Sequence, residues 1–144
     1  GKAEIAFRKG LPIGTILLTH VGNDVYMEAE AATRFLAMKA AAARDGVTLT
    51  ANSGFRSMVS QTALYAAYVA RAFKAPIVAK PGYSNHQGGD AVDIQIPPAG
   101  TAPDDPKRVA SKEYQWLKAN AAKYGFYNDF AAHRETWHWS STGR

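Results

Sequence analysis

The chain has 144 residues, of which 47% are hydrophobic and 20% charged, and it contains no cysteine. This composition is that of an ordinary globular domain with a proper core, and it excludes disulfides, cysteine-ligated zinc and thiol nucleophiles. No apolar run approaches the roughly 18 residues that a membrane-spanning helix needs, so we expect one domain over residues 1–144 and no transmembrane segment.

The net charge is +5, from 17 Lys and Arg against 12 Asp and Glu. A basic surface favours anionic partners such as nucleic acid, anionic lipid or acidic cell-wall polymers. The basic residues are scattered, however, and no Lys/Arg run is interleaved with aromatic residues. We therefore expect no nucleic-acid partner, and the simplest interpretation of the charge is solubility.

The first part of the chain predicts a strand, a helix and a second strand. Residues 14–19 have the pattern of a short buried strand, and apolar residues at helical spacing predict a helix over 27–44 that ends before Gly46. Residues 47–51 alternate apolar and polar, which is typical of a half-buried strand. This strand leads directly into Ser53-Gly54-Phe55-Arg56.

A second helix is predicted after this segment. Ser57 is a suitable N-cap and Pro76 ends the helical pattern. We expect its buried side to be formed by Leu64, Tyr65, Tyr68, Val69 and Phe73.

The later part of the chain predicts a strand, a loop, a helix and a closing strand. Residues 90–96 alternate, so that Val92 and its neighbours pack on a core while Asp93 points into a site. A proline-rich loop over 97–106 could border a cleft. A third helix follows over 107–124, and 135–139 form a short strand. Strands separated by helices and irregular loops indicate an α+β domain, with a small central antiparallel sheet flanked by about three helices.

Two imidazoles and one carboxylate could hold a metal ion. His86 and Asp93 lie seven residues apart around two glycines, which can turn the chain so that a loop residue and a strand residue converge. His138 would supply the third ligand from the other end of the domain. Three protein ligands leave one position of a catalytic zinc for water.

The surrounding residues carry a resemblance to a known family. Ser84-x-His86-x-x-Gly89-x-Ala91-x-Asp93, followed by Glu135-x-Trp137-His138, resembles the zinc D-Ala-D-Ala carboxypeptidase family (VanY-like). Residues 53–57 and 81–84 also resemble that family, and the resemblance spans roughly residues 53–139. It implies the small α+β fold shared with hedgehog domains and lysostaphin-like peptidases.

The resemblance also implies roles for individual residues. His86, Asp93 and His138 would bind one Zn²⁺ per chain, and Glu135 would be the catalytic base. Arg56 would grip the substrate near the scissile bond. The further substrate contacts are expected from Ser84, Gln61, Ser57 and Trp137.

Elementary chemistry agrees with these roles. Zinc lowers the pKa of a bound water toward about 7, and a nearby carboxylate can carry its proton to the leaving amine. Positions three apart in a regular strand face opposite sides, so Glu135 must sit at a strand entrance or bulge if His138 is a ligand. Arg56 precedes a helix N-terminus, where a guanidinium suits a carboxylate or an oxyanion.

Other candidates fit a site less well. Strand register puts Asp90 on the Val92 face, away from Asp93. His20 has no partners in the sequence and is expected to be structural or exposed. His133 is expected to be an exposed loop residue, although it could line the cleft or tune Glu135.

The sequence thus predicts a monomeric zinc metallopeptidase that acts on peptidoglycan stem peptides outside the cytoplasm, most simply as a D-alanyl-D-alanine (or L,D-) carboxypeptidase. One alternative is a peptidoglycan endopeptidase, such as a phage-type endolysin that cleaves between L-alanine and D-glutamate. Another is a zinc-containing cell-wall binding module without catalysis. Glu135 argues against the last, because a pure binding site needs no base.

Overall fold

The computed structural model describes residues 2–74 and 76–144. Its elements are β1 (Lys2–Arg8), β2 (Leu11–Gly22), β3 (Val25–Glu28), α1 (Ala29–Arg44), β4 (Ala51–Ser53), α2 (Met58–Ala70), the 3-10 turn η1 (Asn85–Gly88), β5 (Ala91–Ile94), α3 (Pro106–Val109), α4 (Lys112–Asn120), the 3-10 turn η2 (Ala121–Tyr124), α5 (Phe130–His133) and β6 (His138–Ser140). The α+β class predicted from the sequence is confirmed. No described helix is long and apolar enough to cross a bilayer.

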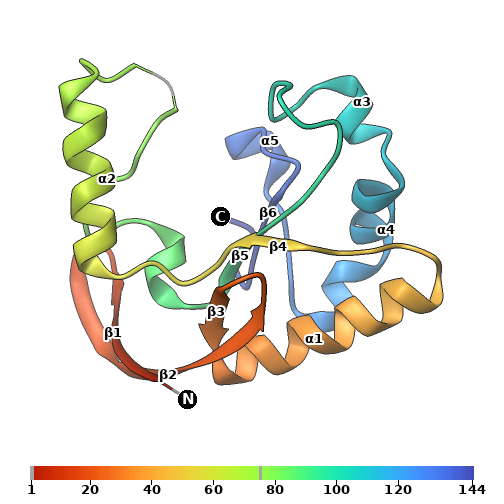
Figure 1. Ribbon diagram of the computed structural model, residues 1–144, viewed down its shortest axis with the longest axis horizontal. Coiled ribbons are helices and arrows are strands. Elements are labelled where there is room, and N and C mark those ends of the chain that lie inside the picture. The colour runs from red at the N-terminus through yellow and green to blue at the C-terminus, as the bar shows by residue number, and fades with distance from the viewer. Residues whose placement is uncertain (1, 75) are drawn as a thin grey trace.

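The strands form two antiparallel sheets of three strands each, in the orders β1-β2-β3 and β4-β5-β6. The second is the small sheet expected from the sequence, with β5 at its centre (Figure 1). The first sheet goes beyond the prediction, because the short strand over 14–19 is part of the 12-residue strand β2.

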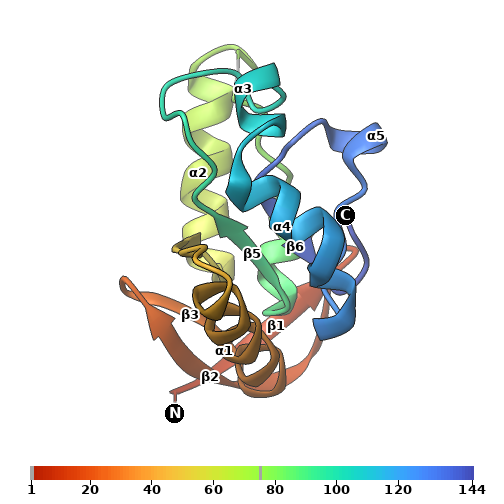
Figure 2. The same cartoon turned by 90° about the vertical axis from the view of Figure 1, so that its right-hand side faces the viewer.

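Helix α1 joins the two sheets into one core. Its apolar stripe, including the fully buried Phe35 and Met38, belongs to the same cluster as Val21 and Met27 of the first sheet and Val92 of the second. Figure 2 shows α1 lying on the β1–β3 sheet, with α4 on the flank of β5 and β6. The core therefore fixes β5 and β6, the two strands that carry predicted metal ligands.

Helix α2 differs from its prediction. Ser57 is indeed its N-cap, since its hydroxyl accepts a hydrogen bond from Ser60 N. The predicted buried side is wrong: Gln61 is the only buried residue of α2, and Leu64 and Phe73 are 41% and 58% exposed. The helix also ends at Ala70, before Pro76 is reached. Figure 1 shows the reason: α2 stands apart from the other described helices, so no other helix packs on its apolar side.

Three other predicted boundaries shift. The alternating segment 47–51 is irregular up to β4, which begins at Ala51. The helix predicted over 107–124 is divided into α3, α4 and η2, because the Ser111 side chain caps α4 by accepting from Tyr114 N. The strand predicted over 135–139 begins only at His138.

Candidate metal centre

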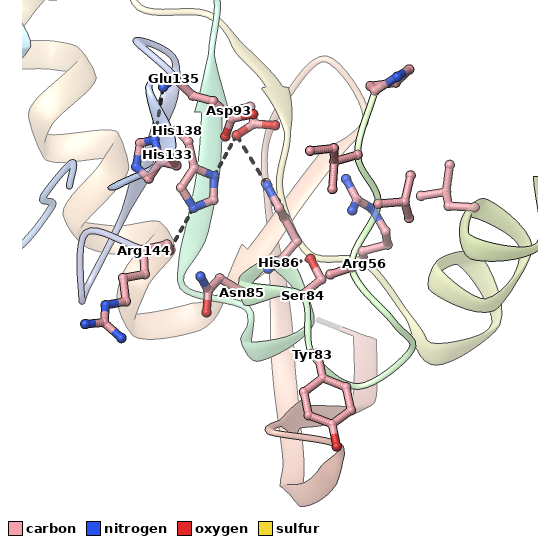
Figure 3. Close-up of a pocket in the computed structure, with 15 residues that line it drawn as sticks. Arg56, Tyr83, Ser84, Asn85, His86, Asp93, His133, Glu135, His138 and Arg144 are labelled. Carbon is pink, nitrogen blue, oxygen red and sulfur yellow. Dashed lines mark hydrogen bonds and ion pairs between the residues drawn. The ribbon is translucent and has the colours of Figure 1, made fainter. Parts of the chain in front are cut away.

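The sheet β4-β5-β6 and the turn η1 bring the three predicted ligands together. Asp93 and His138 are directly paired across β5 and β6. The Oδ1 atom of Asp93 lies 3.0 Å from His138 Nδ1 and 3.3 Å from His86 Nε2, as Figure 3 shows. All three ligand atoms lie within 4.8 Å of one another.

Each imidazole is oriented by a backbone carbonyl through its second ring nitrogen. His86 Nδ1 donates to Gly54 O at 2.8 Å, and His138 Nε2 donates to Arg144 O at 2.8 Å. Because a carbonyl can only accept, these bonds place a proton on the far nitrogen of each ring. The nitrogens that face Asp93 are the ones left free to act as ligands, an arrangement typical of metal-binding histidines.

Two glycines make this convergence possible. Gly89 ends η1 with a φ of 82°, which lets the chain turn from His86 into β5. A Cβ on Gly54 would clash with the carbonyl oxygen of Tyr26, so only glycine fits against β3 there. The close approach of Gly54 is what delivers its carbonyl to His86.

The cluster carries a strongly anionic carboxylate. Burial by itself would raise the pKa of Asp93, but the hydrogen bonds and charges of His138 and His86 outweigh it and hold that pKa far below its ordinary value. Burial would likewise lower the pKa of His138, yet the hydrogen bond and charge of Asp93, with smaller contributions from Arg144 and Glu135, raise it. A metal cation between these three groups would balance the negative charge of the Asp93 carboxylate, in place of the hydrogen bonds from the imidazoles.

The donor set fits zinc. Tetrahedral zinc with bonds of about 2.0–2.1 Å needs nitrogen and oxygen ligands roughly 3.3 Å apart, close to the distances that Asp93 makes with both rings. Both rings are more than nine-tenths buried. His86, Asp93 and His138 would therefore hold the ion and leave a fourth position for a water or a substrate oxygen.

Glu135 lies outside β6, in the irregular segment that leads into it, so its side chain is free of the strand alternation. In Figure 3 its carboxylate lies beside that of Asp93. The backbone of Glu135 is held on both sides: its N–H donates to His133 Nδ1 at 3.0 Å, and its carbonyl accepts from Asn128 Nδ2 at 2.9 Å. Arg134 has a left-handed φ of 58°, which completes the turn.

His133 is therefore more than an exposed loop residue. Its Nδ1 accepts from Glu135, so its proton is on Nε2, which donates to Gly143 O at 3.1 Å. Its ring also packs edge-on against His138, with 5.4 Å between ring centroids. Its place two residues before Glu135 is a signal, but sequence alone does not show these bonds.

Arg56 borders the same cavity and is held by two side chains. Its guanidinium donates to Gln61 Oε1 at 3.0 Å and to Ser53 Oγ at 3.4 Å. Burial lowers its pKa, and the attraction of Asp93 acts in the opposite direction; an arginine so far above neutrality stays charged. Arg56 thus presents an oriented cation in the cavity that the proposed metal ligands line.

The other predicted substrate contacts differ in whether they line the cavity. Ser84 lines the cavity and also caps η1. Gln61 is fully buried, and its amide donates to Ala79 O, so it reaches the cavity only through Arg56. Ser57 is occupied as the cap of α2. Asp90 lies away from the cluster, where its carboxylate contacts Ser141 and Arg8.

His86, Asp93 and His138 open into a cavity of about 420 Å³. On one side it is lined by His133, Glu135 and His138. The lining also includes Leu64 from α2 and Ile77 and Val78 from the following loop, so the side of α2 that was predicted to be buried partly faces this cavity. Sequence periodicity identified an apolar helix face but not what it faces.

Comparison with known proteins agrees with this geometry. The sequence profile of VanY, described as D-alanyl-D-alanine carboxypeptidase, matches residues 24–144. The chain belongs to the VanY family. The predicted resemblance is therefore confirmed, and it extends further toward the N-terminus than residue 53.

Individual relatives support the family membership. The chain is 31% identical over 105 residues to a D-alanyl-D-alanine carboxypeptidase of Enterococcus faecium, a match that covers 72% of this chain and 31% of that protein. The chain thus spans about a third of the length of this curated relative.

Among solved structures, the LdcB LD-carboxypeptidase is 31% identical, with a TM-score of 0.67 over 80% of this chain and 58% of that one. VanYB in complex with D-alanine-D-alanine is 25% identical, with a TM-score of 0.67 over 94% of this chain and 84% of that one.

Proposed function

We propose that this chain is a single zinc peptidase domain that removes a terminal D-alanine from peptidoglycan stem peptides. The observation that carries the proposal is the meeting of His86, Asp93 and His138 beside Glu135 and Arg56 in one cavity. Family membership and the carboxypeptidases among its relatives support the same activity. One zinc per chain, action as a monomer and a location outside the cytoplasm are parts of this proposal.

The residues divide the reaction between them. His86, Asp93 and His138 would hold a zinc ion, which would supply Lewis acidity to the scissile carbonyl and acidify a water molecule. Glu135 takes the proton of the attacking water and delivers it to the leaving amine, a role that suits a carboxylate beside the ligands. Two hydrogen bonds fix the backbone of Glu135, from which this carboxylate projects.

The cavity fits the end of such a peptide. The guanidinium of Arg56 binds the terminal carboxylate of the substrate. Gln61 and Ser53 hold this guanidinium in its orientation. The apolar wall of Leu64, Ile77 and Val78 gives the methyl group of a terminal alanine a surface to contact. Burying Arg56 strengthens its interaction with an anion, because the local dielectric constant is lower than in water.

The test is mass spectrometry of defined muropeptides incubated with zinc-loaded protein and with its chelated form. We expect the loaded protein to release one D-alanine and the chelated form to release none. Cleavage between L-alanine and D-glutamate would instead identify an endopeptidase. Absence of any cleavage, with zinc bound, would leave a cell-wall binding module.

Glu135→Gln provides the accompanying test of the base. Its amide keeps the size of the side chain but cannot accept the proton, so we expect zinc binding to persist while turnover falls by about 10²- to 10⁴-fold. Zinc content measured by mass spectrometry and kcat measured on the same preparation separate the two effects. Turnover equal to that of the unmodified protein would overturn the assignment of Glu135.

A further inference from the structure

A second cavity adjoins the metal centre. It has a volume of about 540 Å³ and shares Asp93 with the first cavity, but Arg56 lines only the first. Its lining includes Asn52, Gln95, Arg108 and Trp137. Figure 1 shows α2 on one side of the β4-β5-β6 sheet and the loop from β5 to α3 on the other. Asp93 therefore lies where the two cavities meet.

Arg108 is a buried cation beside this second cavity. Its side chain donates to Ile96 O, to Thr101 Oγ1 at 2.9 Å and to Thr101 O at 3.1 Å, and the residue is only 7% exposed. Its guanidinium also lies over the Trp137 ring, 4.9 Å from the centroid. All of these partners are neutral.

No carboxylate forms an ion pair with Arg108 among the residues that the structure describes. The three hydrogen bonds use three of the five guanidinium N–H groups. Among the described residues, two N–H donors therefore have no acceptor, and no carboxylate balances the positive charge. Buried arginines are nearly always paired with an anion, because taking a charge out of water is costly. The anion that matches Arg108 is therefore missing from the surrounding part of the chain.

We propose that the second cavity binds a carboxylate carried by the substrate on the N-terminal side of the scissile bond. This inference rests on the proposed peptidase activity, in which Arg56 takes the terminal carboxylate in the first cavity. A peptide that crosses the metal centre then places its preceding residues over Asp93 and toward Arg108. Asn52 and Gln95 are exposed amides beside that path and supply further hydrogen bonds.

Two synthetic stem peptides with the same terminal D-alanine test this proposal. They differ only in carrying a carboxylate or the isosteric carboxamide on the residues before the scissile bond. A charge-assisted hydrogen bond corresponds to roughly a 10- to 100-fold preference. We expect kcat/KM of the unmodified protein to favour the carboxylate peptide by that factor, and affinity for the inactive Glu135→Gln variant to show the same preference.

Variants locate the preference in the second cavity. Arg108→Gln removes the charge, and Gln95→Glu adds an opposing one at an exposed position that does not endanger folding. Both are expected to reduce the carboxylate preference to less than about threefold, since each cancels the field that an anion would feel. Ala37→Glu on the exposed side of α1 adds the same charge outside both cavities and should keep the preference.

The outcomes are distinguishable. Equal kcat/KM for both peptides, or a preference unchanged in Gln95→Glu, overturns the carboxylate site and leaves the proposed activity standing. If neither peptide is hydrolysed, the proposed activity fails, and the affinities measured with Glu135→Gln still decide whether the second cavity prefers an anion.

Discussion

His133 connects the proposed base to a proposed zinc ligand. It accepts the N–H of Glu135, donates to Gly143 O and packs against the His138 ring. We predict that His133→Leu lowers kcat by about 10- to 100-fold, because a displacement of about 1 Å at a reacting group has effects of that size. KM and zinc affinity should change little, since neither Arg56 nor the ligand atoms lose a partner.

The conservative variant His133→Asn serves as the control. Its Oδ1 is as many bonds from the backbone as Nδ1 of histidine and can accept from Glu135 N, so we expect most of kcat to return. Steady-state kinetics with zinc-competition measurements would check both variants. Equal kcat in His133→Leu, or a loss of zinc affinity as large as the loss of kcat, would contradict a positioning role.

The convergence of the proposed ligand residues was predictable because their spacing reflects local geometry. His86 and Asp93 are separated by a turn that glycine makes possible, and the alternation of β5 shows which face Asp93 occupies. The predicted strand entrance at Glu135 was correct for the same reason. The bond between His133 and Glu135 was not predictable, because it depends on a left-handed residue at Arg134 that the sequence does not signal.

The segment between β4 and α2 positions two parts of the site at once. Gly54 delivers its carbonyl to His86, Phe55 N donates to Tyr26 O, and Arg56 N donates to His86 O. We predict that Gly54→Ala destabilises the fold by about 1–3 kcal/mol, because the added Cβ meets the Tyr26 carbonyl, a backbone atom that cannot turn aside. Zinc affinity should fall about 10- to 100-fold, because the strained backbone displaces the carbonyl partner of His86.

Gly88→Ala is the matched control for this substitution. Gly88 also lacks a left-handed φ, and its added Cβ would meet the flexible end of Arg8 first. Urea unfolding and zinc titration should therefore show a smaller loss than for Gly54→Ala. Equal losses in both variants would mean that the close contact with β3 is not what constrains position 54.

Whole elements were predicted less well than residues, and α2 shows why. Helical spacing of apolar residues identifies a helix and a face, but it does not say whether another element covers that face. In α2 the face borders a cavity and solvent, and only Gln61 is buried. The β1–β2 hairpin was missed in a similar way, because Leu11, Ile13 and Leu17 remain exposed and blur the alternation of β2.

Metal binding should stabilise the whole molecule. A ligand that binds only the folded state at 100 times its Kd adds about 2.7 kcal/mol to the free energy of unfolding. For a chain of this size that corresponds to roughly 5–10 °C in Tm. We expect zinc to raise Tm by this amount and chelation to reverse it, as measured by differential scanning calorimetry. An equal zinc effect in Asp93→Asn would exclude this cluster as the binding site.

The chelated protein should show a pH dependence of its own. The folded-state pKa of His138 is raised above its ordinary 6.5, so its stabilising effect is complete below pH 6.5 and is lost as pH rises through the folded value. The pKa of Asp93 is lowered from 3.8, so its effect is complete above that pH and lost only in stronger acid. Urea unfolding of chelated protein should therefore show stability falling above about pH 6.5, and Asp93→Asn should flatten that fall.

The carbonyls of Gly54 and Arg144 that fix the two imidazole tautomers are main-chain atoms. No side-chain replacement at either position deletes such an acceptor; it can only be moved, by bending the turn that presents it. Metal affinity at the proposed site would in this way be coupled to the backbone path of two segments distant in sequence. Distorting either segment should therefore change the ion selectivity or the rate of metal release, even though every coordinating atom is unchanged.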